Sequence, residues 1–149
     1  MMKVCIITGA SSGIGRATAE NMLKLGYKVY GISRSGGHVD NVVSLCADVT
    51  DEQEIFKAVN TVMAESGRID VLINNAGFGI SGAIEFTKTE DAERQFNVNF
   101  FGAVRMCRAV LPIMRKQGFG RIVNIGSVAG DIAIPFQSFY SAAKAALCS

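Results

Sequence analysis

The sequence predicts an α/β fold in which helices cover both faces of a doubly wound parallel sheet. Short runs rich in β-branched and aliphatic residues alternate with longer helix-like stretches, as in consecutive βαβ units. These runs are nearly all apolar rather than alternating, which is typical of strands buried on both faces. The chain of 149 residues, 49% of them hydrophobic, fits a single domain over residues 1–149. The predicted strands occupy residues 3–8, 27–33, 41–47, 70–74 and 121–126.

Composition argues against several classes of partner. The formal net charge of +2 is too small to indicate a nucleic-acid partner or an anionic membrane surface. The apolar run at the N-terminus is far too short for a signal peptide or a membrane span. The four cysteines are scattered, without a CxxC pair or metal-ligand spacing, so we expect free thiols, no metal site and a cytoplasmic location.

Two helices carry start signals. Thr50 followed by Gln53, and Thr87 followed by Glu90, have the spacing of capping boxes. Apolar residues then recur at helical spacing. The first stripe is Ile55, Val59, Val62 and Met63, and the second is Ala92, Phe96, Ala103, Met106 and Val110.

Two features interrupt this regular pattern. Only SRSGGHVD, residues 33–40, separates the second and third strands. This segment is too short for a crossover helix, so we expect a loop there. Pro112 lies inside the longest helical stretch, and we expect it to kink that helix or end its regular part.

The first strand runs directly into a glycine-rich turn, TGASSGIG, at residues 8–15. Glycines permit a tight turn and close approach of a phosphate, and the following helix offers free N–H groups and a positive dipole end. A strand-to-helix turn can also be glycine-rich for backbone reasons alone, but the place of this one favours a dinucleotide site. The predicted cofactor-binding residues here are Thr8, Gly9, Ser11, Ser12, Gly13, Ile14 and Gly15.

The end of the second strand bears on which cofactor binds. NAD sites place an acidic residue about twenty residues beyond the glycines, on the ribose hydroxyls. No Asp or Glu lies between Glu20 and Asp40, and Arg34 is near the expected position. A guanidinium there favours a 2′-phosphate, so the sequence predicts NADP(H) over NAD(H). The alternative is a solvated loop arginine.

Tyr140 and Lys144 are four residues apart, so they would share one face of a helix. A phenol has a pKa near 10, and a nearby ammonium lowers that pKa toward the range useful for proton transfer. The pair alone carries little weight, because this spacing is common on solvated helices. Ser127 adds to it, because it follows the fifth predicted strand, where open α/β sheets place their ligands. Its hydroxyl would bond a substrate carbonyl or, alternatively, cap a helix or turn.

Amide side chains supply further candidates. Asn99 falls on the same stripe as Phe96 and Ala103, where the pattern calls for an apolar residue. A buried amide without hydrogen-bond partners costs about 1–3 kcal/mol, so Asn99 either serves a site or bonds neighbouring backbone. The NNAG segment at 74–77 directly follows the fourth strand and is either a turn or part of a ligand site.

Taken in order, these motifs resemble the short-chain dehydrogenase/reductase family, in the branch marked by TGxxxGxG and YxxxK. The resemblance covers essentially the whole chain. Within the family, NNAGFG, NVNFFG and GRIVNIGSVAG are most similar to 17β-hydroxysteroid-dehydrogenase-like oxidoreductases. The implied fold is a Rossmann-type sheet of strand order 3-2-1-4-5. The matching residues are TGASSGIG at 8–15, Asp48-Val49, NNAG at 74–77, Asn99, Ser127 and YSAAK at 140–144.

The resemblance implies an NADP(H)-dependent oxidoreductase that interconverts a small-molecule carbonyl and an alcohol by hydride transfer. Tyr140 would be the general acid in reduction and the base in oxidation. Lys144 would lower the pKa of Tyr140 and bind the nicotinamide ribose. Ser127 would hold the substrate oxygen, and Asn99 would support a water chain that feeds protons to Lys144. The remaining cofactor contacts would come from Asp48, Val49, Asn75, Ala76 and Gly77.

Family members continue through further strands and a loop that closes over the substrate. The resemblance therefore also implies that the sequence lacks the last strands of the fold and is incomplete at its C-terminus. Helices around 90–117 and 138–149 often form oligomer contacts in the family, so a homo-oligomer is compatible with the sequence. The alternative function is a non-catalytic dinucleotide-binding or interaction module. The motifs do not predict the substrate.

Overall fold

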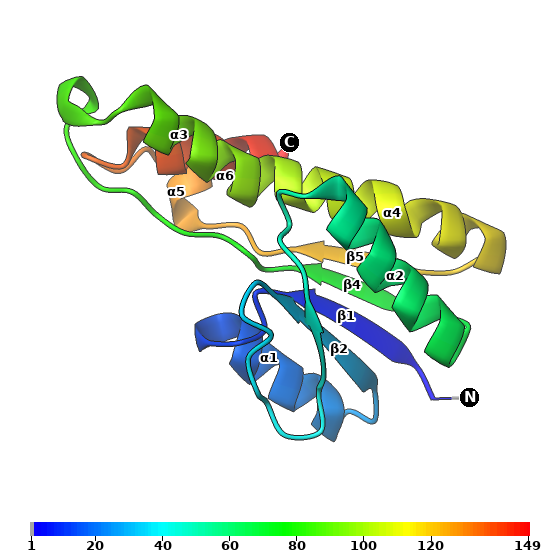
Figure 1. Cartoon of the computed structure of the whole chain (residues 1–149). Helices are drawn as coiled ribbons and strands as arrows, with labels where there is room; N and C mark the ends of the chain where they lie inside the picture. Colours follow the sequence, from blue (N-terminus) through cyan, green and yellow to red (C-terminus); the bar gives the residue numbers. More distant parts are fainter. Residues whose placement is uncertain (1) are drawn as a thin grey trace.

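The computed structural model describes residues 2–149 and shows a five-stranded parallel sheet flanked by helices (Figure 1). All neighbouring strands are parallel, and their order is β3-β2-β1-β4-β5. This arrangement confirms the predicted Rossmann-type fold class and strand order. The strands are β1 (Val4–Thr8), β2 (Lys28–Ser33), β3 (Val43–Cys46), β4 (Val71–Asn74) and β5 (Arg121–Asn124).

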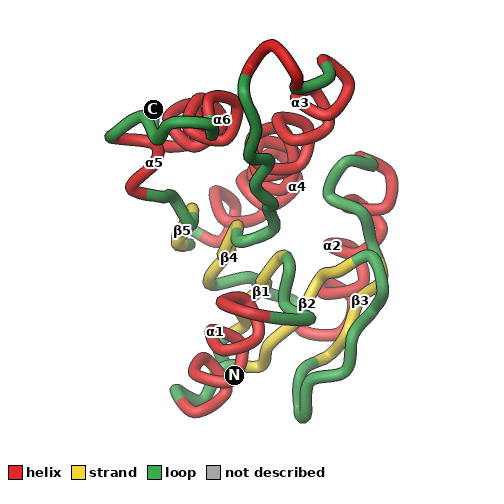
Figure 2. The backbone as a smooth tube through the Cα atoms, turned by 90° about the vertical axis from the view of Figure 1, so that its left-hand side faces the viewer, coloured by secondary structure: helices red, strands yellow, loops and turns green. Residues whose placement is uncertain are grey.

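The helices pack on the sheet in two layers. Side chains of a strand alternate between its faces, and in β1 Ile6 joins the core under α2 and α4 while Ile7 joins the core under α1. Figure 2 shows α1 on one side of the row of strands and α4 on the other. The helices are α1 (Gly13–Lys24), α2 (Glu52–Ser66), α3 (Thr89–Phe96), α4 (Gly102–Gln117), α5 (Val128–Asp131) and α6 (Ser138–Cys148).

The register of the sheet places the functional segments at one edge. Ile6 in β1 lies opposite Tyr30 in β2 and Leu72 in β4. Because the strands are parallel and in register, the carboxyl ends of β1, β2 and β4 lie side by side (Figure 1). The glycine-rich turn, the Arg34 loop and the NNAG segment follow these three ends, so they meet above the sheet. The edge strand β5 is only partly buried.

The predicted loop between the second and third strands is confirmed. Residues 34–42 contain turns and irregular chain but no helix (Figure 2). A Cβ at Gly37 would meet the side chain of Ser11. The loop therefore lies directly against the glycine-rich turn.

The two capping-box predictions are wrong. Helix α2 is capped by Asp51, whose carboxylate accepts hydrogen bonds from the N–H groups of Gln53 (2.8 Å) and Glu54 (3.0 Å). A carboxylate at the N-cap satisfies two free N–H groups at once and is a preferred cap. Thr50 donates to Asp48 instead. Helix α3 follows Lys88 with no side-chain cap bond, and the Thr87 hydroxyl donates to Ala83.

The helical stretch over 90–117 is interrupted before Pro112 rather than at it. Its π-helical turn η2 (Asn97–Phe101) separates α3 from α4. Helix α4 then continues past Pro112 to Gln117, where Gly118 in a left-handed conformation (φ 77°) caps it. Pro112 does not end the helix, so that part of the prediction is wrong. A π-turn in a helix frequently marks a functional site, and Asn99 lies within this one.

Candidate active site

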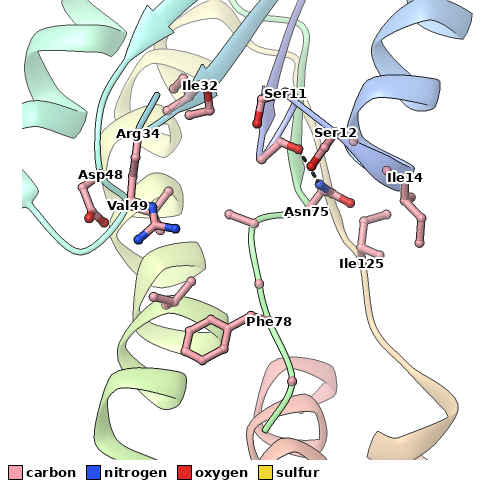
Figure 3. A pocket seen from close by; sticks show the side chains of 18 of the residues that line it. Ser11, Ser12, Ile14, Ile32, Arg34, Asp48, Val49, Asn75, Phe78 and Ile125 are labelled. Carbon is pink, nitrogen blue, oxygen red and sulfur yellow. Dashed lines mark hydrogen bonds between the residues drawn. The ribbon is translucent and has the colours of Figure 1, made fainter. Parts of the chain in front are cut away.

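The carboxyl ends of the strands border a cleft of about 1020 Å³ (Figure 3). Most of the residues predicted to bind cofactor or substrate line it. Thr8, Asn99 and Ser127 are not among the lining residues. The predicted residues that do line the cleft are Gly9, Ser11, Ser12, Gly13, Ile14, Gly15, Arg34, Asp48, Val49, Asn75, Ala76, Gly77, Tyr140 and Lys144.

The glycine-rich turn requires glycine at three positions. Gly9 (φ 68°) and Gly13 (φ 53°) have positive φ values, which side chains disfavour. A Cβ at Gly15 would overlap the carbonyl oxygen of Gly9 and the side-chain amide of Asn75. The start of α1 therefore packs so closely on the turn and on Asn75 that position 15 has no room for a side chain. The turn and the first residues of α1 together form a cradle on the cleft.

Hydrogen bonds connect this turn to the end of β4. The Thr8 hydroxyl oxygen accepts from the N–H groups of Asn75 and Ala76, both at 3.0 Å. The Asn75 side-chain amide donates to the carbonyl oxygens of Thr8 (3.0 Å) and Gly9 (3.3 Å), and Figure 3 shows Asn75 reaching this turn. Thr8 and Asn75 thus tie the end of β4 to the glycine-rich turn. The NNAG segment itself forms no turn, so the turn expected as an alternative is absent.

Arg34, Asp48 and Val49 lie on one side of the cleft in Figure 3. The Arg34 side chain is exposed, and across residues 2–149 no carboxylate forms an ion pair with it. The Asp48 carboxylate accepts from the N–H and hydroxyl of Thr50, both at 2.8 Å. Asp48 therefore has a structural role in the loop, whereas the Arg34 guanidinium is free to meet an anion.

Helix α6 places Tyr140 and Lys144 on the cleft wall. Lys144 is only 5% exposed, and its Nζ donates a hydrogen bond of 2.6 Å to the carbonyl of Ile125. The same Nζ lies 5.9 Å from the centre of the Tyr140 ring. Burial lowers the pKa of Lys144 from its usual value of 10.5, an effect that interaction with Cys148 partly opposes. The pair combines a phenol with a desolvated amine in one cleft.

Ser127 begins the short helix α5 beyond β5. Its hydroxyl oxygen accepts a hydrogen bond of 3.2 Å from the N–H of Ala129, which is the capping role that the sequence left open. Helix α5 packs closely on α6, because a Cβ at Gly130 would lie 2.9 Å from the backbone carbon of Lys144. The segment that carries Ser127 is thereby held against the helix that carries Tyr140.

Asn99 is 1% exposed, and both ends of its amide bind the backbone of Phe78. Its Oδ1 accepts from the Phe78 N–H (3.0 Å) and its Nδ2 donates to the Phe78 carbonyl (2.8 Å). The side chain is thus satisfied by neighbouring backbone, the structural alternative raised above. Phe78 itself lines the cleft, directly after the NNAG segment (Figure 3).

Sequence reasoning missed Gln95 and Arg94. Gln95 is fully buried and its Nε2 also donates to the Phe78 carbonyl, at 3.1 Å. The guanidinium of Arg94 lies 5.3 Å from the centre of the Phe78 ring, and Arg94 lines the cleft. Gln95 is detectable in principle, since it is a second amide one helical turn before Asn99. Arg94 carries no comparable signal, because a charged residue on an amphipathic helix is ordinary.

Two absences concern the described part of the chain, residues 2–149. None of the helices there is long and apolar enough to cross a membrane. In the same part of the chain, no group of three or more His, Cys, Asp or Glu side chains could hold a metal ion. All four cysteines are free thiols, and burial raises the pKa of Cys5 to about 12.

Several known proteins are similar to this chain in sequence and in structure. The chain is 49% identical to the 3-ketodihydrosphingosine reductase of Bacteroides thetaiotaomicron, over 97% of this chain and 54% of that protein. The structure of ElxO with NADP bound is similar at 34% identity and a TM-score of 0.92, covering 99% of this chain and 64% of that one. A short-chain dehydrogenase/reductase from Burkholderia phymatum in complex with NAD is similar at 31% identity and a TM-score of 0.92, covering 99% and 57%.

These matches cover nearly all of this chain but only part of each similar protein. The chain spans about half the length of the curated relatives it matches. The model of the short chain dehydrogenase family, in contrast, matches residues 3–149 of this chain. With the sheet order and the glycine-rich turn described above, this match assigns the chain to the short-chain dehydrogenase/reductase family of oxidoreductases.

Proposed function

We propose that the protein is an NADP(H)-dependent oxidoreductase that interconverts a carbonyl and an alcohol, with Tyr140 as the acid/base group. The observation that carries the proposal is the shared cleft, which the glycine-rich turn borders together with Tyr140 and Lys144. When bound, the nicotinamide supplies or accepts the hydride. The narrower resemblance to 17β-hydroxysteroid-dehydrogenase-like enzymes stays a prediction.

The turn at the start of α1 fits the pyrophosphate of a dinucleotide. Gly9 and Gly15 allow the close packing of the turn, α1 and Asn75 that shapes the cradle described above. The N-cap residue Ser12 makes no side-chain cap bond, and the first turn of α1 contains no acidic residue. Free N–H groups and the positive end of the helix dipole therefore face the cradle, where an anion is favoured.

Lys144 and Tyr140 supply the proton chemistry of the proposal. An ammonium group has three N–H donors, and the Ile125 carbonyl takes one from Lys144. The others remain for the Tyr140 oxygen and a ribose hydroxyl. In the reducing direction the Tyr140 hydroxyl gives its proton to the substrate oxygen as negative charge develops there, and Lys144 stabilises the phenolate left behind.

Ser127 and Asn99 have supporting roles in the proposal. The Ser127 oxygen accepts from Ala129, so its own proton stays free to bond a substrate carbonyl. Both side-chain ends of Asn99 are used on Phe78. In this proposal, Asn99 therefore feeds protons to Lys144 through its main-chain groups and not through its side chain.

The charges around the cleft favour NADP(H) over NAD(H) within this proposal. The lining residues include the cations Arg34, Arg94 and Lys144 and one carboxylate, that of Asp48. Arg34 follows β2, at the strand end where an NAD site would place its acidic residue. A guanidinium there adds charge-assisted bonds to a 2′-phosphate. The similar structures include one protein with NADP and one with NAD, so the preference rests on Arg34.

The relative from Bacteroides thetaiotaomicron suggests where to look for a substrate. At 49% identity, it makes 3-ketodihydrosphingosine the first ketone to test. The purified protein should oxidise NADPH when this ketone, or another in a panel of aliphatic and cyclic ketones, is added. Tight binding of dinucleotide with no turnover of any carbonyl would contradict the proposal and favour the non-catalytic binding module.

A further inference from the structure

Two amides one helical turn apart hold the same backbone carbonyl. Gln95 Nε2 and Asn99 Nδ2 both donate to the Phe78 carbonyl, at 3.1 and 2.8 Å. The Phe78 N–H donates to Asn99 Oδ1 at 3.0 Å. A carbonyl oxygen has two lone pairs, so both are used here. The peptide that joins Phe78 to Gly79 is therefore fixed in orientation by the helix it faces.

The same peptide leads directly to the proposed acid/base group. A Cβ built on Gly79 would lie 3.7–4.0 Å from three atoms of the Tyr140 ring. Phe78, Gly79 and Tyr140 all line the cleft. The Phe78–Gly79 segment is thus a wall beside the ring, with room for a methyl group between Gly79 and the ring. A tilt of this peptide would change the space in which the ring sits.

Stability alone does not explain an amide at position 95. The Gln95 side chain is fully buried, and no residue in 2–149 donates to its Oε1. An unpaired buried acceptor destabilises the folded state, and an aliphatic side chain of similar size would avoid that cost. Asn99 already gives the Phe78 carbonyl one donor. What Gln95 adds is a second constraint on the direction of that carbonyl.

We propose that Gln95 is a positioning residue for Tyr140, acting through the Phe78–Gly79 peptide. Its effect on turnover rests on the proposed acid/base role of Tyr140, whereas its effect on the ring position does not. Removal of the Gln95 amide leaves the peptide held by Asn99 alone, and the Tyr140 ring then samples positions unsuited to proton transfer.

The chain offers a matched control for this proposal. Gln117 makes a similar amide clamp on Ile69, accepting from its N–H at 3.0 Å and donating to its carbonyl at 2.8 Å. Gln117 does not line the cleft. Gln95→Leu and Gln117→Leu both remove an amide that clamps the backbone, but only the first affects the wall beside Tyr140. Gln117→Leu should lower the melting temperature more, because it leaves both backbone groups of the buried Ile69 without that partner.

The test compares the two variants in protein labelled with 3-fluorotyrosine, with Tyr140→Phe identifying the Tyr140 resonance. Gln95→Leu should shift or broaden that resonance and lower kcat for ketone reduction about tenfold, with the KM for the ketone changed less than about twofold. Gln117→Leu should leave the resonance and kcat unchanged. An unchanged Tyr140 resonance in Gln95→Leu would overturn the inference. If the wild-type protein reduces no ketone, the proposed function fails, and the resonance still decides the positioning claim.

Discussion

Lys144 is a buried lysine, whereas most lysines lie on the surface. It is 5% exposed, and its one recorded hydrogen bond runs to the Ile125 carbonyl. Burial favours the neutral amine and lowers its pKa. Its Nζ lies 5.9 Å from the centre of the Tyr140 ring, where a positive charge on the protonated amine favours the phenolate form of the proposed acid/base group.

The lowered pKa of Lys144 predicts how stability varies with pH. In the window between the lowered folded pKa and the usual 10.5, the unfolded chain binds more protons than the folded one. The free energy of unfolding of the wild type, relative to Lys144→Met, should therefore rise with pH across that window. Urea denaturation of both proteins at several alkaline pH values measures the difference, and a difference independent of pH would be inconsistent with the buried amine.

Arg34 makes a prediction about cofactor choice. Arg34→Asp should lower the preference for NADPH over NADH at least about tenfold, because it removes a charge-assisted bond and adds repulsion of the 2′-phosphate. Lys57→Asp is the control, since Lys57 is exposed on α2 and does not line the cleft. Fluorescence titration gives both dissociation constants. An equal ratio in Arg34→Asp and wild type would refute the role of Arg34.

Single residues also show what a sequence leaves open. Asn99 and Ser127 were each compatible with a site or with a structural bond, and the structure shows the structural bonds. Neither set of bonds excludes the proposed roles. The Ser127 hydroxyl can still donate its proton, and the main-chain groups of Asn99 take no part in its bonds to Phe78. The contact of Gln95 with Phe78 joins positions 17 residues apart. It depends on how α3 lies over the NNAG segment, which no local pattern encodes.

At the scale of elements, the turn between β1 and α1 is the most constrained part of the cleft. It is tied to the end of β4 by the bonds of Thr8 and Asn75, and the loop after β2 packs on it at Gly37. A change in this turn is therefore transmitted to the segments that would hold both ends of a dinucleotide.

Gly15→Ala tests the turn. Its Cβ would overlap the Gly9 carbonyl and the Asn75 amide, so the turn must shift away from α1 and the cradle must change shape. The dissociation constant for NADPH should rise at least about tenfold, which equals about 1.4 kcal/mol. Gly118→Ala is the control: Gly118 has a positive φ of 77° with no neighbour within 4 Å of an added Cβ. It should cost about 1 kcal/mol of stability with unchanged NADPH binding, and equal binding in both variants would argue against the cradle.

Elements differ in how well the sequence predicts them. The five strands were placed within about two residues, because long apolar runs have few alternatives in a sheet covered on both faces. The caps of α2 and α3 were misplaced, because Asp51, directly after Thr50, takes the N–H groups at the start of α2, and because no side chain caps α3. The π-turn at Asn97–Phe101 was not predicted, because one extra residue in a helical turn leaves the apolar stripe nearly unchanged.

At the scale of the whole molecule, the sheet order brings separate segments to one edge. Strands β1 and β4 are neighbours in the sheet, although β1 ends at Thr8 and β4 begins only at Val71. The strand order was predictable from the family resemblance. The loop in place of a helix after β2 was predictable from the short distance between the second and third strands. The shape of the cleft was not, because it depends on tertiary contacts such as those of Asn75 and Gln95.

Binding of a dinucleotide in the cleft should stabilise the whole fold, because residues at or directly after the carboxyl ends of all five strands line the cleft. At a concentration of NADPH one hundred times its dissociation constant, the gain is about 2.7 kcal/mol. This corresponds to a rise in melting temperature of roughly 5–10 °C for a chain of this size. Differential scanning calorimetry with NADPH, NADH and no ligand measures it, and no shift with either dinucleotide would speak against the cleft as a cofactor site.

If this cleft reduces carbonyls with Tyr140 as the proton donor, removal of the Tyr140 hydroxyl should abolish most of the activity, so Tyr140→Phe is the decisive variant. The variant keeps the ring against Gly79 and removes only the hydroxyl. The measurement is kcat for NADPH-dependent ketone reduction, together with the dissociation constant for NADPH. We expect kcat to fall at least about 100-fold, with NADPH binding changed less than about threefold. A loss of less than about tenfold in kcat would contradict it.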